Sequence, residues 1–462
     1  MNSSATDVAR DSANGFKRHL VRSLGLKEAF ALVVGTVIGT GVFLKAAVMS
    51  QTTGSPYWVL AAWAAAGVLS FLGALCYAEL GSLYPKAGGE YVFLREAYGD
   101  FAGFLFGWMR FWIATPGSIA AYGVGVATFL SAIVEYGSPA GKNFIALSCI
   151  IVFSGINCFT VLVGGRMQAL LTAFKITIIL ALTGAIFFGG TGGSFEHLTP
   201  AGASDFRGWS AFGTAMLAAL WAYDGWCNMP MAAGEIENPE RNIPKALAIG
   251  MIAVFFIYAG ANLSYFYALP FGEVLSAYSP AHTSSLPIAT KAVQAVFGPT
   301  AVVVLTIAFV VSALGAMNGS ILTGARIPFA MARDGLFFRR MGEIGKRSRS
   351  PVFAVVVQAL IASVLALSGT FDQLTNYVVF ASWIFYALAT GALFIFRFRH
   401  PDMPRSFRVP GYPFLPGVFL IASILLLGNT LMTSPQESVI GLGFILSGVP
   451  VYFWFKRGKY KN

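Results

Sequence analysis

The stretch 33–43 contains three glycines, Gly35, Gly39 and Gly41, in an otherwise apolar sequence. Glycine destabilises a helix by about 1 kcal/mol relative to alanine, so this density of glycine favours local unwinding. Gly35 and Gly39 also form the GxxxG spacing that lets two helices pack closely. Taken alone, the pattern fits either an interrupted helix or a packing surface.

A second apolar stretch, 220–226, is interrupted by Asp224 and Gly225. An unwound helix inside a membrane is tolerated only where it lines a cavity, because its N–H and C=O groups need partners. The N–H groups that begin one half-helix suit a carboxylate, and the C=O groups that end the other suit an ammonium group. Two such breaks would together bind a zwitterion, and a free α-amino acid is the obvious ligand.

The composition indicates that these segments lie in a membrane. Hydrophobic residues make up 56% of the 462 residues and charged residues only 11%, whereas a soluble domain carries roughly 25% charged residues. A hydrocarbon layer about 30 Å thick needs about 20 apolar residues per helix. Charge-free windows of suitable length are 57–78, 111–134, 144–163, 176–195, 247–271, 299–325, 351–371, 373–396, 411–436 and 438–455. With the interrupted segments 29–44 and 208–233, they predict an all-α integral membrane protein of twelve spans.

The two interruptions occupy corresponding places in this series of spans. Each stands in the first span of a five-span block, spans one to five and spans six to ten. Paired breaks of this kind indicate the binding site in transporters that are built from inverted repeats. Their position therefore favours the interrupted-helix interpretation.

The basic residues orient the chain. Most of the 31 lysines and arginines lie in the terminal tails, 1–27 and 456–462, and in alternate loops. By the positive-inside rule both termini are cytoplasmic, and we expect a multi-pass protein of the cell (plasma) membrane. The net charge of +11 then reports orientation, so no nucleic-acid partner is implied. The cysteines and histidines show no metal-ligand spacing, and we expect no cofactor.

Lys175 needs a separate explanation, because it lies eight residues into the fifth span counted from Gln168. A lysine near the interface can extend its side chain to water. A lysine deep in hydrocarbon is costly, and such a residue is a functional candidate by default.

Six short motifs, in order along nearly the whole chain, resemble those of the amino acid–polyamine–organocation superfamily, and within it the L-type amino-acid transporter branch. They are GTVIGTGVF at 35–43, KAGGEY at 86–91, GEIENP at 234–239, RNIP at 241–244, NGS at 318–320 and RDG at 333–335. The resemblance implies two inverted five-helix repeats, 28–195 and 208–396, with discontinuous first and sixth helices, followed by two helices within 411–455. It also implies sodium-independent transport of L-amino acids, often by exchange.

The resemblance further assigns residues to the substrate. Thr40 and Gly41 would bind its carboxylate, whereas the carbonyl groups of Val37, Trp221 and Asp224 would receive its amino group. Trp221 would also occupy the position of an outer aromatic gate. The tenth span would place three residues in the side-chain pocket or its surroundings: Phe380, Ser382 and Trp383.

In similar sodium-independent members, a fifth-helix lysine takes the place of a sodium ion. Lys175 would then bridge carbonyl groups near Gly35 and Gly39 in the first helix and Ser312 in the eighth. No sodium gradient would be needed. If Lys175 instead gains and loses a proton, the protein is a proton-coupled symporter, so exchange and proton symport both stay open.

Two departures from many L-type members bear on substrates and partners. Asp224 stands where they have a small uncharged residue, and a carboxylate there is similar to the branch that accepts dibasic amino acids and cystine. We expect neutral amino acids as substrates, with acceptance of cationic ones. The alternative is a cationic amino-acid or polyamine permease. Asp224 could also cap a half-helix or form a hydrogen bond to a neighbouring span. The segment 136–142 lacks the cysteine that joins animal heterodimeric members to a glycoprotein, so no disulfide-linked heavy chain is expected.

An intramembrane enzyme is disfavoured. It would need clustered catalytic groups such as two aspartates or an H-E-x-x-H pair. Within the predicted spans, Asp224 is essentially the only carboxylate, with Glu79 near an inner end.

Overall fold

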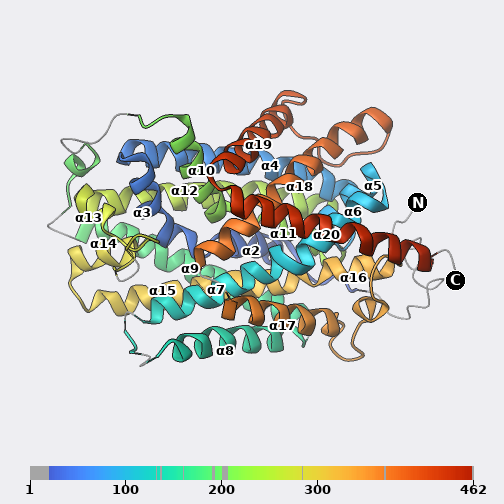
Figure 1. The fold of residues 1–462 in the computed structure, drawn as a ribbon, viewed down its shortest axis with the longest axis horizontal. Helices are drawn as coiled ribbons and strands as arrows, with labels where there is room; N and C mark the ends of the chain where they lie inside the picture. Colours follow the sequence, from blue (N-terminus) through green and yellow to red (C-terminus); the bar gives the residue numbers. More distant parts are fainter. Residues whose placement is uncertain are drawn as a thin grey trace.

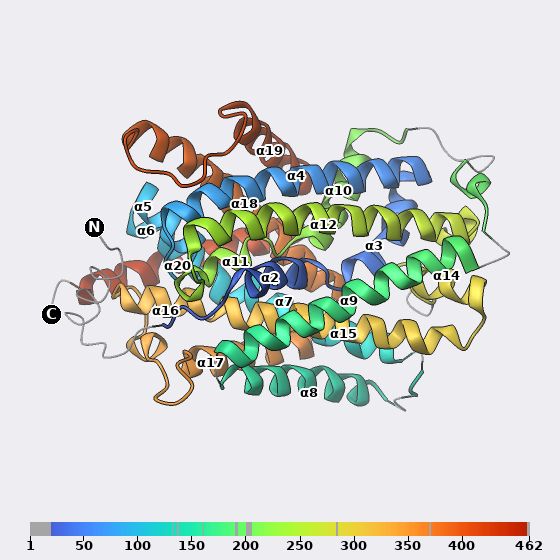
Figure 2. The ribbon, with the colours of Figure 1, turned by 180° about the vertical axis from the view of Figure 1, so that it is seen from behind.

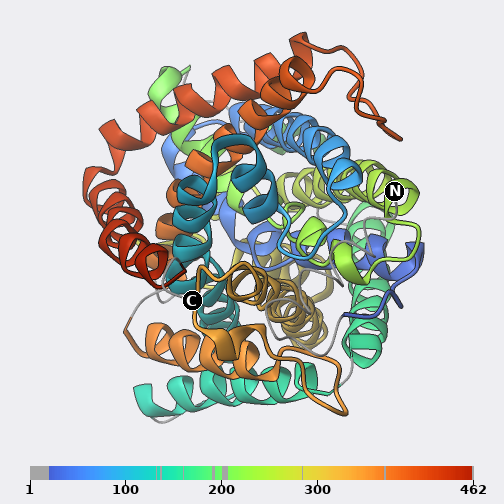
Figure 3. The same ribbon diagram turned by 90° about the vertical axis from the view of Figure 1, so that its right-hand side faces the viewer.

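The computed structural model describes residues 20–131, 133–135, 138–159, 161–189, 193–199, 206–282, 285–368 and 371–459. These residues form a bundle of long helices that run along a common direction (Figures 1 and 2). Residues 20–25 and the last turns of α20 lie at the same end of the bundle (Figure 2). Seen along its length, the bundle surrounds a central group of helices (Figure 3).

The first predicted block contains one interruption near its start. Its elements are α2 (Leu26–Val37), α3 (Gly41–Thr53), α4 (Pro56–Leu83), α5 (Glu90–Tyr98), α6 (Asp100–Met109), the π-helical turn η1 (Arg110–Ala114), α7 (Thr115–Leu130), α8 (Pro139–Asn157) and α9 (Val161–Gly189). The charge-free windows 111–134 and 176–195 start later than the helical runs Asp100–Leu130 and Val161–Gly189. Arg110 and Lys175 stand directly before these windows, although each lies inside a continuous helical run.

The remaining elements contain the second interruption. They are η2 (Phe195–Leu198), α10 (Trp209–Tyr223), α11 (Asn228–Met231), η3 (Ala233–Glu235), α12 (Pro239–Ala268), α13 (Phe271–Leu275), α14 (Ile288–Phe297), α15 (Ala301–Gly324), α16 (Arg326–Arg333), η4 (Arg339–Gly342), α17 (Val352–Ser368), α18 (Phe371–Arg399), α19 (Phe414–Thr433) and α20 (Pro435–Lys459). α14 is a short apolar helix, and most residues of α5 are buried.

Length and apolarity identify the membrane-crossing helices. Within the described residues, ten helices are long and apolar enough to cross a bilayer, and Leu26–Thr53 counts as one of them. The predicted spans 208–233 and 351–371 contain α10 and α17, which have 15 and 17 residues. Large apolar side chains cover the outside of the bundle: Phe188 is 93% exposed and Met432 86%. Such a surface requires lipid rather than water, so the chain is a multi-pass membrane protein.

The interrupted segments lie at the centre. The region Leu26–Thr53 is almost entirely buried, whereas most of Val161–Gly189 is not. α2 packs against α9, α12 and α15, and α3 packs mainly against α10 (Figures 1 and 2). Interior backbone that leaves the helical hydrogen-bond ladder is thereby kept away from lipid.

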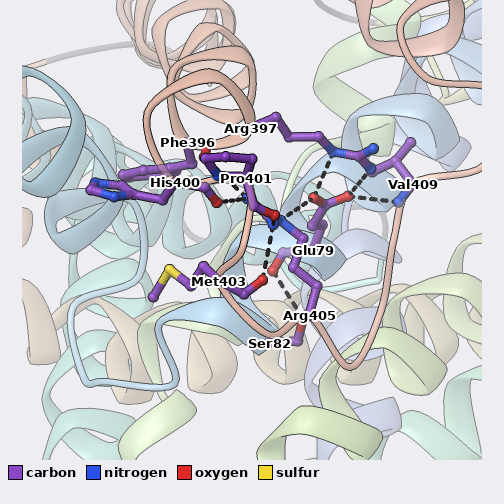
Figure 4. A network of polar contacts seen from close by, with 9 residues as sticks. All are labelled: Glu79, Ser82, Phe396, Arg397, His400, Pro401, Met403, Arg405 and Val409. Atoms are coloured by element: carbon purple, nitrogen blue, oxygen red, sulfur yellow. Dashed lines mark hydrogen bonds and ion pairs between the residues drawn. The ribbon is translucent and has the colours of Figure 1, made fainter.

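At one end of the bundle, a buried carboxylate joins several elements. Glu79, near the end of α4, is fully buried and accepts hydrogen bonds from Arg397 Nε at 2.9 Å, Arg397 Nη2 at 2.6 Å and the Val409 amide at 2.7 Å. Arg405 Nε lies 3.3 Å from the same carboxylate. Figure 4 shows how these groups join α4 to the end of α18 and to the loop that follows it.

The same end holds a second buried ion pair. Arg326 Nε and Nη2 each donate to Glu235 at 2.9 Å, and neither side chain is more than 1% exposed. The backbone carbonyl of Glu235 accepts from the amides of Ser23 and Leu24, both at 2.9 Å. The segment that precedes α2, the end of the second interrupted helix and α16 are thus tied together.

We predict that Glu79→Gln lowers the thermal unfolding midpoint of the detergent-solubilised protein. Removing one partner of a buried ion pair costs about 3–5 kcal/mol when the remaining charge is uncompensated. Because Arg397 is partly exposed, we expect the lower part of that range. Glu273→Gln is the control, since its pair with Lys291 is exposed and is worth about 0–1 kcal/mol. Equal midpoints for the two variants would contradict the role assigned to Glu79.

Candidate functional site

The two helix breaks pack directly against each other. α2 ends at Val37 and α3 begins at Gly41, and α10 ends at Tyr223 and α11 begins at Asn228. Gly225 has φ +121°, and a Cβ there would lie 2.9 Å from the Thr36 carbonyl group. Both the conformation and the space therefore require glycine.

A second close approach lies on the other side of the same junction. A Cβ on Gly41 would lie 2.5 Å from the Cβ of Ala222 and 2.7 Å from its Cα. The start of α3 and the end of α10 are therefore in backbone-to-backbone contact. The glycines that interrupt the first segment thus also bring the two breaks together.

Hydrogen bonds between the breaks satisfy several of the released carbonyl groups. The Thr36 hydroxyl lies 3.0 Å from the Gly225 carbonyl oxygen and 2.5 Å from that of Leu32, and it can donate to either. The Tyr258 hydroxyl of α12 lies 2.9 Å from the carbonyl oxygens of both Val37 and Ala222 and can donate to either. The Trp221 carbonyl, another predicted ligand, accepts from the Asp224 amide at 3.2 Å. Sequence reasoning missed Tyr258, because a tyrosine in an apolar helix gives no distinguishing signal.

Thr40 stands at the start of α3 with an unused hydroxyl. It is the residue that precedes the first turn, but its side chain makes no capping hydrogen bond. Its Oγ1 is buried and has no hydrogen-bond partner among the described residues. Buried hydroxyl groups are normally paired, so this one is available to a ligand. A helix start also favours a negative charge.

The three residues predicted on the tenth span are placed differently from one another. Phe380 packs against Gly441 of α20, and Trp383 stacks on Phe419 of α19 with ring centroids 5.6 Å apart. Ser382 is buried with an unpartnered Oγ, within the described part of the chain. It lies one helical turn before Tyr386 on the same face. Tyr386, which the sequence analysis missed, is the α18 residue that contacts the second break.

Asp224 forms that contact. Its Oδ1 accepts a hydrogen bond from the Tyr386 hydroxyl at 2.6 Å. The same hydroxyl lies 3.0 Å from Cys227 Sγ. Trp221, two residues before the break, lies beside Tyr122 of α7, with ring centroids 6.3 Å apart. The second break therefore carries both a carboxylate and an aromatic wall.

Lys175 lies in the middle of α9 and is fully buried. Its Nζ donates to the carbonyl groups of Gly35 at 2.9 Å, Ile38 at 2.6 Å and Ser312 at 2.9 Å. The three ammonium protons thus have three acceptors. The Ser312 hydroxyl lies 3.2 Å from the Ile38 carbonyl and 3.1 Å from that of Gly39. The Lys175 amino group consequently joins the first break to α15.

Two charged residues near the second break were not recognised as part of the site from the sequence. Arg110 is 4% exposed in η1, and Glu90 at the start of α5 is fully buried. Burial, the main cause, raises the pKa of the Glu90 carboxyl to about 8. Arg110 was visible as an arginine between apolar windows. Glu90 was hidden in a polar segment that gave no indication of burial.

Comparison with known proteins identifies the class. The fold is that of a helical multi-pass membrane protein built around interrupted helices, and the family model "Amino acid permease" matches residues 24–455. The chain belongs to this family, and thus to the amino acid–polyamine–organocation superfamily, which makes it a membrane transporter and not an enzyme.

Curated relatives match over nearly the whole chain. The serine/threonine exchanger SteT of Bacillus subtilis (strain 168) is 33% identical over 451 residues, covering 96% of this chain and 98% of the relative. The human b(0,+)-type amino acid transporter 1 is 32% identical, covering 96% of this chain and 89% of the relative. The rat large neutral amino acids transporter small subunit 2 is 30% identical, covering 98% of this chain and 84% of the relative. These relatives confirm the L-type resemblance.

We predict that Gly225→Ala destabilises the protein by about 1–3 kcal/mol, because a side chain is strained at positive φ and meets the Thr36 backbone. The thermal unfolding midpoint in detergent should fall. Gly443→Ala in α20 is the control, since nothing lies within 4 Å of an added Cβ there. An unchanged midpoint for Gly225→Ala would show that the breaks are not packed as described.

Proposed function

We propose that the protein is a sodium-independent L-amino-acid transporter that exchanges neutral amino acids by alternating access. The observation that carries this proposal is the pair of facing helix breaks, with the ammonium group of Lys175 bound at the first. The names of the relatives support it, since one is a serine/threonine exchanger and two are amino-acid transporters.

In this proposal the substrate zwitterion spans the two breaks. Its carboxylate binds Thr40 and Gly41 at the start of α3, where the unpartnered Thr40 hydroxyl awaits an acceptor. Its ammonium group binds carbonyl groups of Val37, Trp221 and Asp224; a carbonyl oxygen that already accepts one hydrogen bond keeps a second lone pair. Trp221 forms the outer gate. Of the three predicted α18 residues, Ser382 lines the pocket. Phe380 and Trp383 pack behind it, against α20 and α19.

Lys175 replaces a transported cation. Its charge is already bound by three carbonyl groups, so an added sodium ion would meet electrostatic repulsion there. The resemblance supplies the same interpretation. Proton symport through Lys175 is the competing mechanism and is decided by the transport assay below.

The wider architecture follows the same proposal. Residues 28–195 and 208–396 form the two inverted repeats, and the helices within 411–455 follow them. Both tails, 1–27 and 456–462, face the cytoplasm of a cell whose plasma membrane holds the protein; residues 1–19 and 460–462 lie outside the described residues. The segment 136–142 carries no cysteine, so the transporter works without a disulfide-linked heavy chain; Tyr136 and Gly137 also lie outside the described residues.

The test is transport by the purified protein in liposomes. Labelled alanine, leucine and arginine are offered to empty vesicles and to vesicles that contain unlabelled amino acid, with and without a sodium or a pH gradient. We expect uptake of alanine that requires internal amino acid and no gradient. Equal uptake into empty and loaded vesicles contradicts exchange, and dependence on a proton gradient supports symport instead. Strict dependence on sodium contradicts the role of Lys175.

We predict that Lys175→Met reduces alanine exchange at least about tenfold, because it leaves buried carbonyl groups at Gly35, Ile38 and Ser312 without a donor. Lys142→Met is the control, since Lys142 is an exposed lysine of α8. Initial exchange rates in proteoliposomes, normalised to the amount of protein, provide the measurement. An exchange rate equal to that of the wild type would contradict the bridging role.

We predict that Asp224→Asn weakens arginine transport more than alanine transport. A carboxylate beside the substrate attracts a cationic side chain, and the amide does not. The measured quantity is the ratio of arginine to alanine uptake in the same vesicles. Equal losses for the two substrates would show that Asp224 does not face the side chain.

A further inference from the structure

Arg110 lies in the middle of the continuous helical run α6–η1–α7, inside a membrane-crossing segment. It is 4% exposed, so its charge reaches neither lipid headgroups nor bulk water. It also begins the π-helical turn η1, a distortion that is frequent at functional sites. An intramembrane arginine is costly, and one that faces the bundle interior is retained for a function.

The guanidinium group points at the second helix break. Arg110 Nη2 donates to Asn228 Oδ1 at 2.7 Å and lies 3.5 Å from Met231 Sδ. Asn228 is the first residue of α11, directly after the break. Arg110 Nε is buried and has no hydrogen-bond partner within the described part of the chain. The guanidinium group is therefore bound at the break, but its Nε–H makes no hydrogen bond to the described residues.

A short series of contacts joins Arg110 to Asp224. Asn228 Oδ1, which accepts from Arg110, also lies 3.7 Å from Cys227 Sγ. Cys227 Sγ lies 3.0 Å from the Tyr386 hydroxyl, and that hydroxyl donates to Asp224 at 2.6 Å. Arg110 is in addition close enough to interact electrostatically with Asp224.

Glu90 is the other carboxylate in this group. The hydroxyl of Tyr77 donates to its Oε1, and its Oε2 is buried without a partner among the described residues. With a pKa of about 8, raised mainly by burial, Glu90 is mostly protonated at neutral pH. When Asp224 is ionised, a form that the hydrogen bond from Tyr386 stabilises, its negative charge cancels the positive charge of Arg110.

This balance decides which substrate side chains the site can accept. Buried charges are tolerated when they are paired, and an uncompensated one is strongly disfavoured. An uncharged side chain leaves the balance at zero. A cationic side chain adds a positive charge to a site where Asp224 is already neutralised by Arg110.

We propose that Arg110 determines the charge class of the substrate, by balancing Asp224 and so selecting amino acids with uncharged side chains over cationic ones. This inference rests on the proposed function, because it assumes that the amino acid binds at the two breaks. It also explains how a carboxylate at position 224 is compatible with a transporter of neutral amino acids.

The test measures equilibrium binding of arginine and of alanine to the purified transporter, through the stabilisation each gives against thermal unfolding. Four proteins are compared: the wild type, Arg110→Gln, Arg110→Lys, and the double variant Arg110→Gln/Asp224→Asn. We expect Arg110→Gln to raise the affinity for arginine relative to alanine at least about tenfold. Arg110→Lys keeps the charge and should stay near the wild-type ratio, and the double variant should lose the gain.

Several results would overturn the proposal. An unchanged ratio in Arg110→Gln, with both affinities reduced, would show that Arg110 only anchors Asn228. A similar gain in Arg110→Lys would show that shape rather than charge is responsible. If the wild type binds neither amino acid, the proposed function itself fails; if it binds alanine and the ratio is insensitive to Arg110, only the charge selection fails.

A second measurement avoids any substitution of Arg110. The charged and titratable groups that face Glu90 are Tyr77 of α4, Arg110 of η1, Asp224 and Cys227 at the second break, and Tyr386 of α18. Raising the pH from about 6.5 to about 8.5 moves Glu90 through its pKa and adds a negative charge. The arginine-to-alanine affinity ratio of the wild type should rise over this range. A flat ratio, or an equal rise in Glu90→Gln, would contradict the balance described here.

Discussion

The structure depends on one constraint: backbone carbonyl groups released inside a bilayer must find donors within the protein. At the first break, the ammonium group of Lys175 meets the Gly35 and Ile38 carbonyl groups and reaches Ser312 on α15. Between the breaks, the Tyr258 hydroxyl can donate to a carbonyl group on either side. The central interruption is therefore held by donors from α9 and α12. Any movement of α9 or α12 relative to the first break would have to exchange these contacts.

A second constraint concerns buried charge. Arg110, Asp224 and Glu90 come from three separate elements, and each would be unfavourable alone. Amide, thiol and hydroxyl groups link Arg110 to Asp224 at the second break, and Glu90 accepts a hydrogen bond from Tyr77 nearby. At the tied end of the bundle, Glu79 and Glu235 pair with arginines.

The sequence predicted the parts of the site that come from local patterns. The glycine-rich break, the buried lysine and the carboxylate at position 224 could be found because each violates the rules for an ordinary apolar helix. Arg110 and Lys175 precede two charge-free windows, which therefore start later than the helical runs that contain these residues. Tyr258, Tyr386 and Glu90 were missed, because their roles arise from helix packing rather than from neighbours in the chain. Phe380 was assigned by resemblance, and the structure places it against α20.

The central claim is that both charged ends of one free amino acid are recognised between the two breaks. Competition against labelled alanine by propionate and by alaninamide tests it most directly, since the first lacks the amino group and the second lacks the carboxylate. A site with buried polar groups for each end should reject both analogues, each binding at least about tenfold more weakly than alanine. If either analogue competes as well as alanine, the corresponding break does not bind that end of the substrate.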